Sequence, residues 1–299
     1  MMEIANAANG ENGGTSYEEA KKLADDIMAR IKCRPVVGII CGSGLGELAN
    51  MVTDTEIMGY EEIPGFPVST VPGHAGKLVF GQLGGKPVVL MKGRVHFYEG
   101  FTMQKTALPI RIMKLLGVQI LIVTNAAGGI NQEYEIGDLM IIKDHINMPG
   151  FAGMNPLHGQ NDERFGPRFP AISKAYTKRL RDHAKTTAKS LGFEGFRIHE
   201  GVYCMLAGPS FETVTECKFL NMIGVDVTGM STCPEVVVAA HCGMEVFGMS
   251  LVTNKVVMQY DSEQVANHEE VLETGALRSK DLQKLVAAML TTLEIKSQP

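Results

Sequence analysis

The sequence predicts a single α/β domain in which helices flank a central β-sheet. Residues 120–124 form an apolar, β-branched run that is too short for a helix, as expected for a strand buried on both faces. Two further apolar runs, at residues 36–41 and 246–252, also end in small or polar residues. Segments with strand and helix patterns alternate without a compositional break. Because open α/β sheets bind ligands at the carboxyl ends of their strands, we expect the functional site there.

The composition argues against several classes of function. The net charge is −5 and there is no basic run, so nothing indicates nucleic-acid binding. The longest apolar stretches are interrupted well short of a membrane span, and the first residues have neither the basic start nor the apolar core of a signal peptide. Residues 1–15 are rich in Asn and Gly and are expected to be disordered, which leaves residues 16–299 as the single domain.

Cysteine and histidine usage argues against a metal site. The six cysteines lie mostly within apolar segments and form no C-x-x-C pair, which is typical of buried free thiols in the reducing cytoplasm. His74 and His96 are not spaced as helix-borne metal ligands, and no carboxylate partner is obvious from the sequence. We therefore expect neither disulfides nor zinc, and a cytoplasmic protein.

The first half of the chain begins with a helix and continues through three strands. Ser16 and Glu19 form a capping box that begins the first helix. Gly84-Gly85 predicts a two-residue hairpin turn, and Pro109 is expected to kink the helix that contains it. The expected elements are a helix from Ser16, a strand at 36–41, a short helix at 47–51, hairpin strands at 78–83 and 86–91, and a helix at 102–116.

The second half repeats the alternation after the strand at 120–124. The expected elements are strands at 138–143, 197–205, 225–230 and 245–252, a helix at 173–191, and three helices that begin in capping boxes at Thr213 with Glu216, Thr232 with Glu235 and Asn267 with Glu270. Residues 145–170 are rich in Gly, Pro and Asn. A connection of that length without periodic structure is usually a functional segment or an interface.

Residue types that bind anions recur in the predicted loops. The segment 42–46, GSGLG, lacks G-x-G-x-x-G spacing and a Walker lysine, so alone it is a weak nucleotide signal and equally suits a tight strand-to-helix turn. More informative is the set of anion-binding residue types in the predicted loops, which comprises Ser43, His74, Arg94, His96 and Ser231. Ser231 directly precedes a predicted helix, whose free N–H groups favour an anion. Each residue alone could be an ordinary loop residue, but together they predict a phosphate site. No G-x-S-x-G motif occurs, which argues against an α/β-hydrolase.

Ten short motifs, in order and spread over residues 36–282, resemble the trimeric purine nucleoside phosphorylases that act on 6-oxopurine nucleosides. The motifs are GSGLG (42–46), PGHAG (72–76), GRVHFYEG (93–100), TNAAGG (124–129), DHIN (144–147), NDERFGPRFP (161–170), AGPSFET (207–213), GMSTCPE (229–235), SLVTNK (250–255) and NHEEV (267–271). The resemblance implies a mixed, twisted sheet flanked by helices, in a homotrimer. It also implies a pentosyltransferase of purine salvage, in which phosphate converts inosine or guanosine, and their 2′-deoxy forms, to free base and α-ribose 1-phosphate. No metal or organic cofactor is implied.

The same resemblance assigns site residues position by position. The phosphate site would comprise Ser43, His74, Arg94, His96, the backbone at Ala126, and Ser231. The ribose site would comprise Tyr98, Met230, His268, and Phe169 from a neighbouring subunit. The base site would comprise Phe211, Glu212, Thr253, Asn254 and Val256. Asn254, Glu212, His268 and His96 would carry the catalytic roles.

Chemistry explains why these residue types suit the reaction. Cleavage of the glycosidic bond develops positive charge on the ribose and negative charge on the purine, and Asn254 can stabilise the latter through N7 and O6. An ionised Glu212 only accepts hydrogen bonds, so it suits the N1–H and 2-amino groups of hypoxanthine and guanine. Without the resemblance, Glu212 is a candidate to cap the next helix, and Phe169 and Phe211 would more often be core residues.

Two other functions fit less well. Methylthioadenosine phosphorylases share the fold but carry aspartate where this chain has Asn254, and lack a polar histidine matching His268. A purine-binding protein without catalytic activity would not need Arg94, His96 and Ser231. The chain departs from the family pattern at Thr228, where relatives carry an apolar residue, and at Cys233, where valine is frequent; either change could retune affinity.

Overall fold

The computed structural model describes residues 15–43, 45–71, 75–193, 198–263 and 268–295, with the side chains at 268–270, 272 and 276 left out. Nine strands within these ranges form one sheet in the order β2-β3-β4-β1-β5-β8-β7-β6-β9. The strands are β1 (Val37–Cys41), β2 (Thr53–Gly59), β3 (Lys77–Leu83), β4 (Lys86–Lys92), β5 (Ile120–Gly129), β6 (Leu139–Asn147), β7 (Ile198–Met205), β8 (Val227–Gly229) and β9 (Glu245–Lys255).

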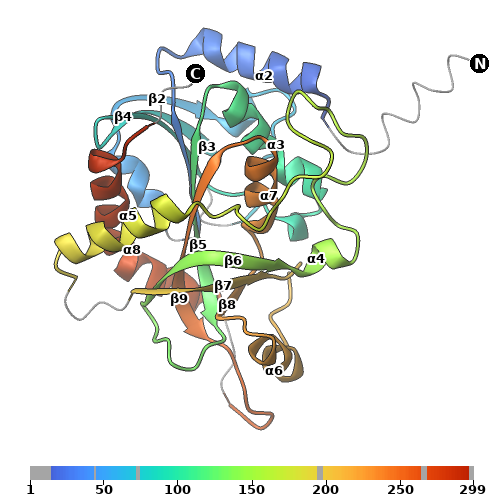
Figure 1. Ribbon diagram of the computed structural model, residues 1–299, viewed down its shortest axis with the longest axis vertical. Coiled ribbons are helices and arrows are strands. Elements are labelled where there is room, and N and C mark those ends of the chain that lie inside the picture. The colour runs from blue at the N-terminus through green and yellow to red at the C-terminus, as the bar shows by residue number, and fades with distance from the viewer. Residues whose placement is uncertain (1–14, 44, 72–74, 194–197, 264–267, 296–299) are drawn as a thin grey trace, which may run out of the picture.

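The sheet is mixed and partly closed. Strand β5 is parallel to both β1 and β9, whereas β3–β4 and β6–β9 are antiparallel pairs. Because β9 pairs with β5 as well as β6, strands β5, β8, β7, β6 and β9 close into a ring, and β1 to β4 extend from β5 as an open wing. Strand β5 crosses β6 and β7 steeply in Figure 1, as a strongly twisted sheet requires.

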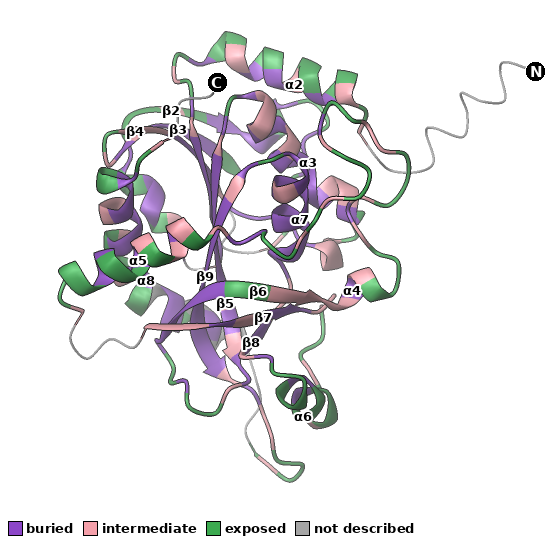
Figure 2. Cartoon of the chain, in the orientation of Figure 1, coloured by how far each residue is buried: buried purple, intermediate pink, exposed green. Residues whose placement is uncertain are grey.

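Helices cover both faces of the sheet. They are α2 (Tyr17–Arg30), α3 (Met103–Leu115), α4 (Met148–Phe151), α5 (Lys178–Ser190), α6 (Val214–Met222), α7 (Cys233–His241) and α8 (His268–Thr292), with short 3-10 helices η1 (Gly46–Met51), η2 (Tyr60–Glu62) and η3 (Phe97–Glu99). Helix α3 packs against α2 and α7 on one side, and α5 packs against α8 on the other (Figure 1). Two large hydrophobic cores and a smaller third one result, and alternation along β1 places Ile40 in the first and Ile39 in the second. The buried strands run between the partly exposed helices in Figure 2.

Most of the predicted elements are confirmed. The capping boxes at Ser16 and Thr213 form as expected, with each hydroxyl accepting the amide of Glu19 or Glu216 at 3.2 Å. Gly84 and Gly85 both have positive φ, as the hairpin between β3 and β4 requires. Within the described residues, no helix is long and apolar enough to cross a bilayer. The predicted cap Asn267 and residues 1–14 of the predicted extension lie outside the described residues.

Other expectations are wrong, each for a long-range reason. The helix expected from residue 173 begins only at Lys178, because the backbone of Tyr176 forms a β-bridge with Val246. The strand expected to end at residue 124 continues through Gly129, since β9 pairs with it along its whole length. Strand β2 gave no sequence signal, because it is an edge strand with a largely exposed face.

The predicted capping box of Thr232 with Glu235 is also wrong. Thr232 has a φ of +76° and makes no side-chain capping bond. Glu235 instead accepts a hydrogen bond from Nε of Arg94 at 2.6 Å, and both side chains are buried. A buried carboxylate forms a stronger hydrogen bond with a buried guanidinium than with a neutral backbone amide, which explains the outcome.

Candidate active site

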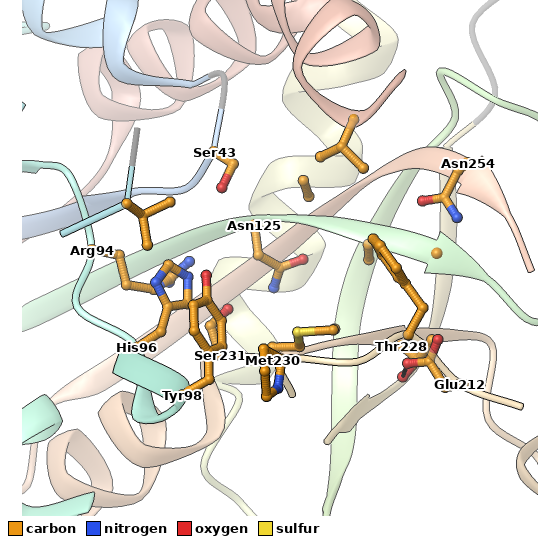
Figure 3. Close-up of a pocket in the computed structure, with 18 residues that line it drawn as sticks. Ser43, Arg94, His96, Tyr98, Asn125, Glu212, Thr228, Met230, Ser231 and Asn254 are labelled. Atoms are coloured by element: carbon orange, nitrogen blue, oxygen red, sulfur yellow. Dashed lines mark hydrogen bonds between the residues drawn. The ribbon is translucent and has the colours of Figure 1, made fainter. Parts of the chain in front are cut away.

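A cavity of about 290 Å³ opens where β1, β5, β8 and β9 deliver their carboxyl ends or neighbouring loops. Ten of the expected site residues line it: Ser43, Arg94, His96, Tyr98, Ala126, Phe211, Glu212, Met230, Ser231 and Asn254. Figure 3 shows Ser43, Arg94 and His96 at the left end and Glu212 and Asn254 at the right, with Met230 between them. The cavity therefore has two chemically different ends.

Arg94 is the buried cation of the first end. Its side chain is only 2% exposed. Nε donates to Glu235 at 2.6 Å, and Nη1 donates to the carbonyl oxygen of Thr124 at 2.9 Å. These two bonds fix the guanidinium plane, and Glu235 offsets part of the cost of burying the charge. A fixed guanidinium that lines a cavity is suited to hold a phosphate.

His96 is oriented by a carboxylate three residues later. Oε1 of Glu99 accepts the His96 amide at 2.7 Å and lies 3.3 Å from Nδ1 of the same residue. Burial alone would raise the pKa of Glu99, but hydrogen bonds from His96 and Thr70 lower it to about 2, so the carboxylate is ionised. When Nδ1 donates to Glu99, Nε2 is the nitrogen available to a ligand.

Tyr98 stacks on His96, with ring centroids 4.7 Å apart and planes 17° apart. Burial, reinforced by the nearby charge of Glu99, raises the pKa of Tyr98 to about 12. The phenol therefore stays neutral and can donate a hydrogen bond. Behind it, an added Cβ at Gly208 would lie 2.5 Å from Sδ of Met230 and 3.0 Å from the Tyr98 ring, so only glycine allows this packing.

Ser231 and Thr232 stand at the start of α7. The Tyr203 hydroxyl accepts the Ser231 amide at 3.2 Å and donates to the Ser231 carbonyl oxygen at 3.1 Å. The positive φ of Thr232 is strained for a β-branched residue. Its hydroxyl accepts Nδ2 of Asn125 at 2.9 Å, which helps to hold the strained backbone in place.

Sequence reasoning missed Asn125. This side chain is buried, lines the cavity, and has no partner for Oδ1 among the described residues. Oδ1 can therefore accept a hydrogen bond from a ligand hydroxyl. A polar residue that directly follows an apolar strand was the available signal. The small residues that follow Asn125 favour a loop and so obscure this signal.

The second end pairs a carboxylate with an amide. Oγ1 of Thr228 donates to Oε1 of Glu212 at 3.2 Å, and Oγ1 of Thr253 lies 3.3 Å from Oδ1 of Asn254. Burial raises the pKa of Glu212, and two hydrogen bonds, one from its own backbone and one from Thr228, oppose that rise. An added Cβ at Gly128 would lie 3.5 Å from Nδ2 of Asn254, so glycine leaves the floor between the two groups open.

Sequence and structure comparisons place this site in a known family. The Phosphorylase superfamily profile matches residues 36–291. Purine nucleoside phosphorylase from Bos taurus is 52% identical over 282 residues, covering 94% of this chain and 97% of the relative, and that from Bacillus subtilis is 50% identical over 277 residues, covering 93% and 99%. The solved Schistosoma purine nucleoside phosphorylase in complex with hypoxanthine is 48% identical, with a TM-score of 0.90 over 94% of this chain and 100% of that one.

The chain belongs to the purine nucleoside phosphorylase family. The single α/β fold with a mixed sheet is confirmed by these structural matches.

Five residues of the purine nucleoside phosphorylase pattern are not among those lining the cavity. His74 and the side chain of His268 lie outside the described residues. Thr253 is fully buried beneath Asn254, because a β-bulge between Ala127 and Gly128 leaves it without a partner residue on β5. Val256 lines an adjoining cavity that shares Glu212 and Asn254 with the first.

Phe169 is the fifth of these residues. It is 88% exposed and does not line the cavity of its own chain, and the guanidinium of Arg168 lies 5.6 Å from its ring centroid. Phe151 in the same 145–170 connection is also largely exposed. Both rings lie in the connection for which the sequence predicts a functional segment or an interface.

Proposed function

We propose that this cavity catalyses the phosphorolysis of 6-oxopurine nucleosides. Phosphate attacks the anomeric carbon as the bond to N9 breaks, the bonding electron pair leaves with the purine, and the products are free base and α-ribose 1-phosphate. The observation that carries the proposal is the pairing, in one cavity, of an anion-binding end around Arg94 with a carboxylate–amide end at Glu212 and Asn254. A site that binds a phosphate and a nucleoside together needs both the anion-binding end and the carboxylate–amide end.

The anion-binding end positions the nucleophile. Arg94 supplies the charge, Ser43 and Ser231 supply hydroxyl groups, and the backbone at Ala126 lines the same wall. Phosphate held below the sugar stabilises the positive charge that develops on the ribose, and then adds to it. The neighbouring start of α7 adds the favourable end of a helix dipole. No step requires a metal or an organic cofactor.

Tyr98 and Met230 lie where the ribose would sit, between the two ends. The neutral phenol of Tyr98 suits a ribose hydroxyl, and the unpartnered Oδ1 of Asn125 suits a second hydroxyl, of ribose or of phosphate. We assign the 5′-hydroxyl to His268 on the resemblance alone. The test compares inosine with 5′-deoxyinosine: His268→Ala should slow inosine much more, and equal slowing would reject the assignment.

The second end stabilises the leaving base. With Oδ1 of Asn254 facing Thr253, Nδ2 is free to donate to O6 or N7 of the departing purine. Glu212 accepts from N1–H and, in guanine, from the 2-amino group. Schistosoma purine nucleoside phosphorylases have been solved with inosine at 49% identity and with guanosine at 47% identity, which supports this assignment. One has also been solved with adenosine, so a 6-amino base can enter such a site.

We further propose a cytoplasmic homotrimer in which Phe169 reaches into the neighbour's ribose site. Its exposure, and that of Phe151, supports a covered surface. Mixing Phe169→Ala chains with Glu212→Ala chains should restore some intact sites, because each defect would lie in a different site. Subunit exchange confirmed by mass without recovered activity would reject a shared site.

The alternatives fit less well. Methylthioadenosine phosphorolysis would favour an acceptor at residue 254, whereas Asn254 offers a donor. A purine-binding protein without activity would not need to bury Arg94 against Glu235 at the cavity wall.

A product assay tests the proposed function. The full chain with inosine and phosphate should release hypoxanthine and an equal amount of ribose 1-phosphate, and omission of phosphate should stop both. Hypoxanthine release that does not depend on phosphate, or no release at all, would overturn the proposal.

A further inference from the structure

Thr228 has a fixed position that the reaction as described does not explain. It lies on β8 between two neighbouring strands, opposite Gly128 of β5 and Cys204 of β7. Its side chain is almost fully buried yet lines the cavity. Cγ2 faces Gly128, lying 3.6 Å from where a Cβ would be, and Oγ1 donates to Glu212 at 3.2 Å. Because χ1 of a β-branched side chain is restricted, the hydroxyl stays directed at Glu212, beside which Thr228 lies in Figure 3.

Two hydrogen bonds lower the pKa of Glu212, one from its own backbone and one from the Thr228 hydroxyl. Among the described residues, no Lys, Arg or His forms an ion pair with it. The titratable groups nearest to it are Glu216 on α6, which repels it, and the thiols of Cys204 on β7 and Cys217 on α6. Burial raises the pKa of both thiols, to about 12 and about 11, so neither supplies charge. The Thr228 hydroxyl therefore supplies a side-chain hydrogen bond to the carboxylate in addition to the backbone bond.

We infer that Thr228 is a positioning residue that stabilises the ionised form of Glu212, and thereby extends to lower pH the range over which the base site selects purines with a hydrogen on N1. The inference rests on the proposed function and adds what sets the pH range of that choice. Hydrogen bonding to a charged form favours that form, while burial favours the neutral form. At Glu212 the two effects oppose each other, because burial raises its pKa, whereas its own backbone hydrogen bond and the bond from Thr228 lower it.

Loss of the hydroxyl would change which base the site prefers. A protonated Glu212 gains an O–H donor. That donor matches the lone pair at N1 of adenine and conflicts with the N1–H of hypoxanthine. Base selectivity should therefore change with pH in both proteins, and in a variant without the hydroxyl it should change at a higher pH than in the wild type.

Three substitutions separate the hydroxyl from the shape of the side chain. Thr228→Val keeps the branched shape and loses the hydroxyl, Thr228→Ser keeps the hydroxyl and loses the methyl group, and Thr228→Ala loses both. For Thr228→Val, the acidic limb of the kcat/KM profile for inosine should move up by about one pH unit. On that limb, the adenosine-to-inosine ratio of kcat/KM should rise about tenfold. Thr228→Ser should keep the wild-type limb, and the KM for phosphate should change in neither variant.

The inference is overturned if the acidic limb stays in place in Thr228→Val, or moves equally in Thr228→Ser. If Thr228→Val does not fold, Thr228→Ala and Thr228→Ser form the deciding pair, since both lack the methyl group and only Ser has the hydroxyl. A wild-type enzyme that does not cleave inosine with phosphate would refute the proposed function. An active wild type without a limb shift specific to the hydroxyl would refute only the role of Thr228.

Discussion

The two ends of the active site are held in place very differently. At the phosphate end, Arg94 donates hydrogen bonds to both α7 and β5. The Tyr203 hydroxyl binds both the amide and the carbonyl oxygen of Ser231. At the base end, Glu212 receives one side-chain hydrogen bond, from Thr228, and Phe211 is 41% exposed. The phosphate end is therefore preorganised for one constant co-substrate. The base end has fewer restraints, and single substitutions there can retune it.

The largest effect should follow from breaking the buried pair at the phosphate end. Arg94→Met leaves Glu235 buried without its cation, which should lower the free energy of unfolding by about 3–5 kcal/mol. It should also lower kcat/KM about a thousandfold, with the KM for phosphate rising more than that for inosine. Chemical unfolding and initial rates measure the two effects.

The double variant Arg94→Met/Glu235→Gln separates folding from function. Removing both charges should restore much of the stability, because no unpaired charge stays buried. Activity should stay low, since the phosphate ligand is still missing. A double variant with wild-type activity would show that Arg94 serves only the fold.

At the base end, Asn254→Asp should have the next largest effect. Replacing an amide donor by an acceptor at O6 or N7 should lower inosine turnover at least about a hundredfold, or roughly 2–3 kcal/mol. Adenosine turnover should appear or rise, while the KM for phosphate stays nearly constant. If Asn254→Asp still prefers inosine, this residue does not choose the base.

Glu99→Gln should weaken the phosphate end by a smaller amount. Losing the charge that orients His96 should lower kcat/KM about tenfold, mainly through the KM for phosphate. Because the pKa of Glu99 is lowered from 4.5 to about 2, its contribution to stability is present above about pH 4.5 and is lost as the pH falls toward 2. In urea, the free energy of unfolding of the wild type should therefore exceed that of the variant at neutral pH, and the difference should disappear in acid. A difference that does not change with pH would mean that the charge of Glu99 is not the stabilising feature.

The smallest effect should come from Thr253→Val. The hydroxyl that faces Oδ1 of Asn254 at 3.3 Å would be lost, leaving the amide free to rotate. Inosine turnover should fall only about two- to fivefold, because one neutral hydrogen bond is removed. Thr253→Ser should recover most of it. A loss as large as that of Asn254→Asp would indicate that Thr253 contacts the base directly.

The sequence predicted best those features that depend on local chemistry. The apolar run of β5 is recognisable as a strand by itself, and Arg94 and Ser231 are anion-binding residue types wherever they occur. The glycine after β1 also has a local signal and a close-packing reason, because a Cβ at Gly42 would lie 2.7 Å from the backbone of Asn125.

What the sequence did not predict depends on partners far along the chain. Glu235 had the spacing of a capping box, but its carboxylate is taken by Arg94, 141 residues away. Asn125 seemed to lie in a loop because its strand is completed only by pairing with β9. The bulge that turns Thr253 under Asn254 likewise belongs to the pair of strands and not to either one alone.

The phosphate end and the base end should act independently. A double-variant cycle of Glu99→Gln and Asn254→Asp tests this independence most directly. The measurement is kcat/KM for inosine and adenosine, with the KM for phosphate, in all four proteins. We predict that, of the two substitutions, only Asn254→Asp changes the inosine-to-adenosine ratio and only Glu99→Gln changes the KM for phosphate, and that the coupling energy stays below about 0.5 kcal/mol. A coupling well above about 1 kcal/mol, or a change in base selectivity on Glu99→Gln alone, would contradict the claim.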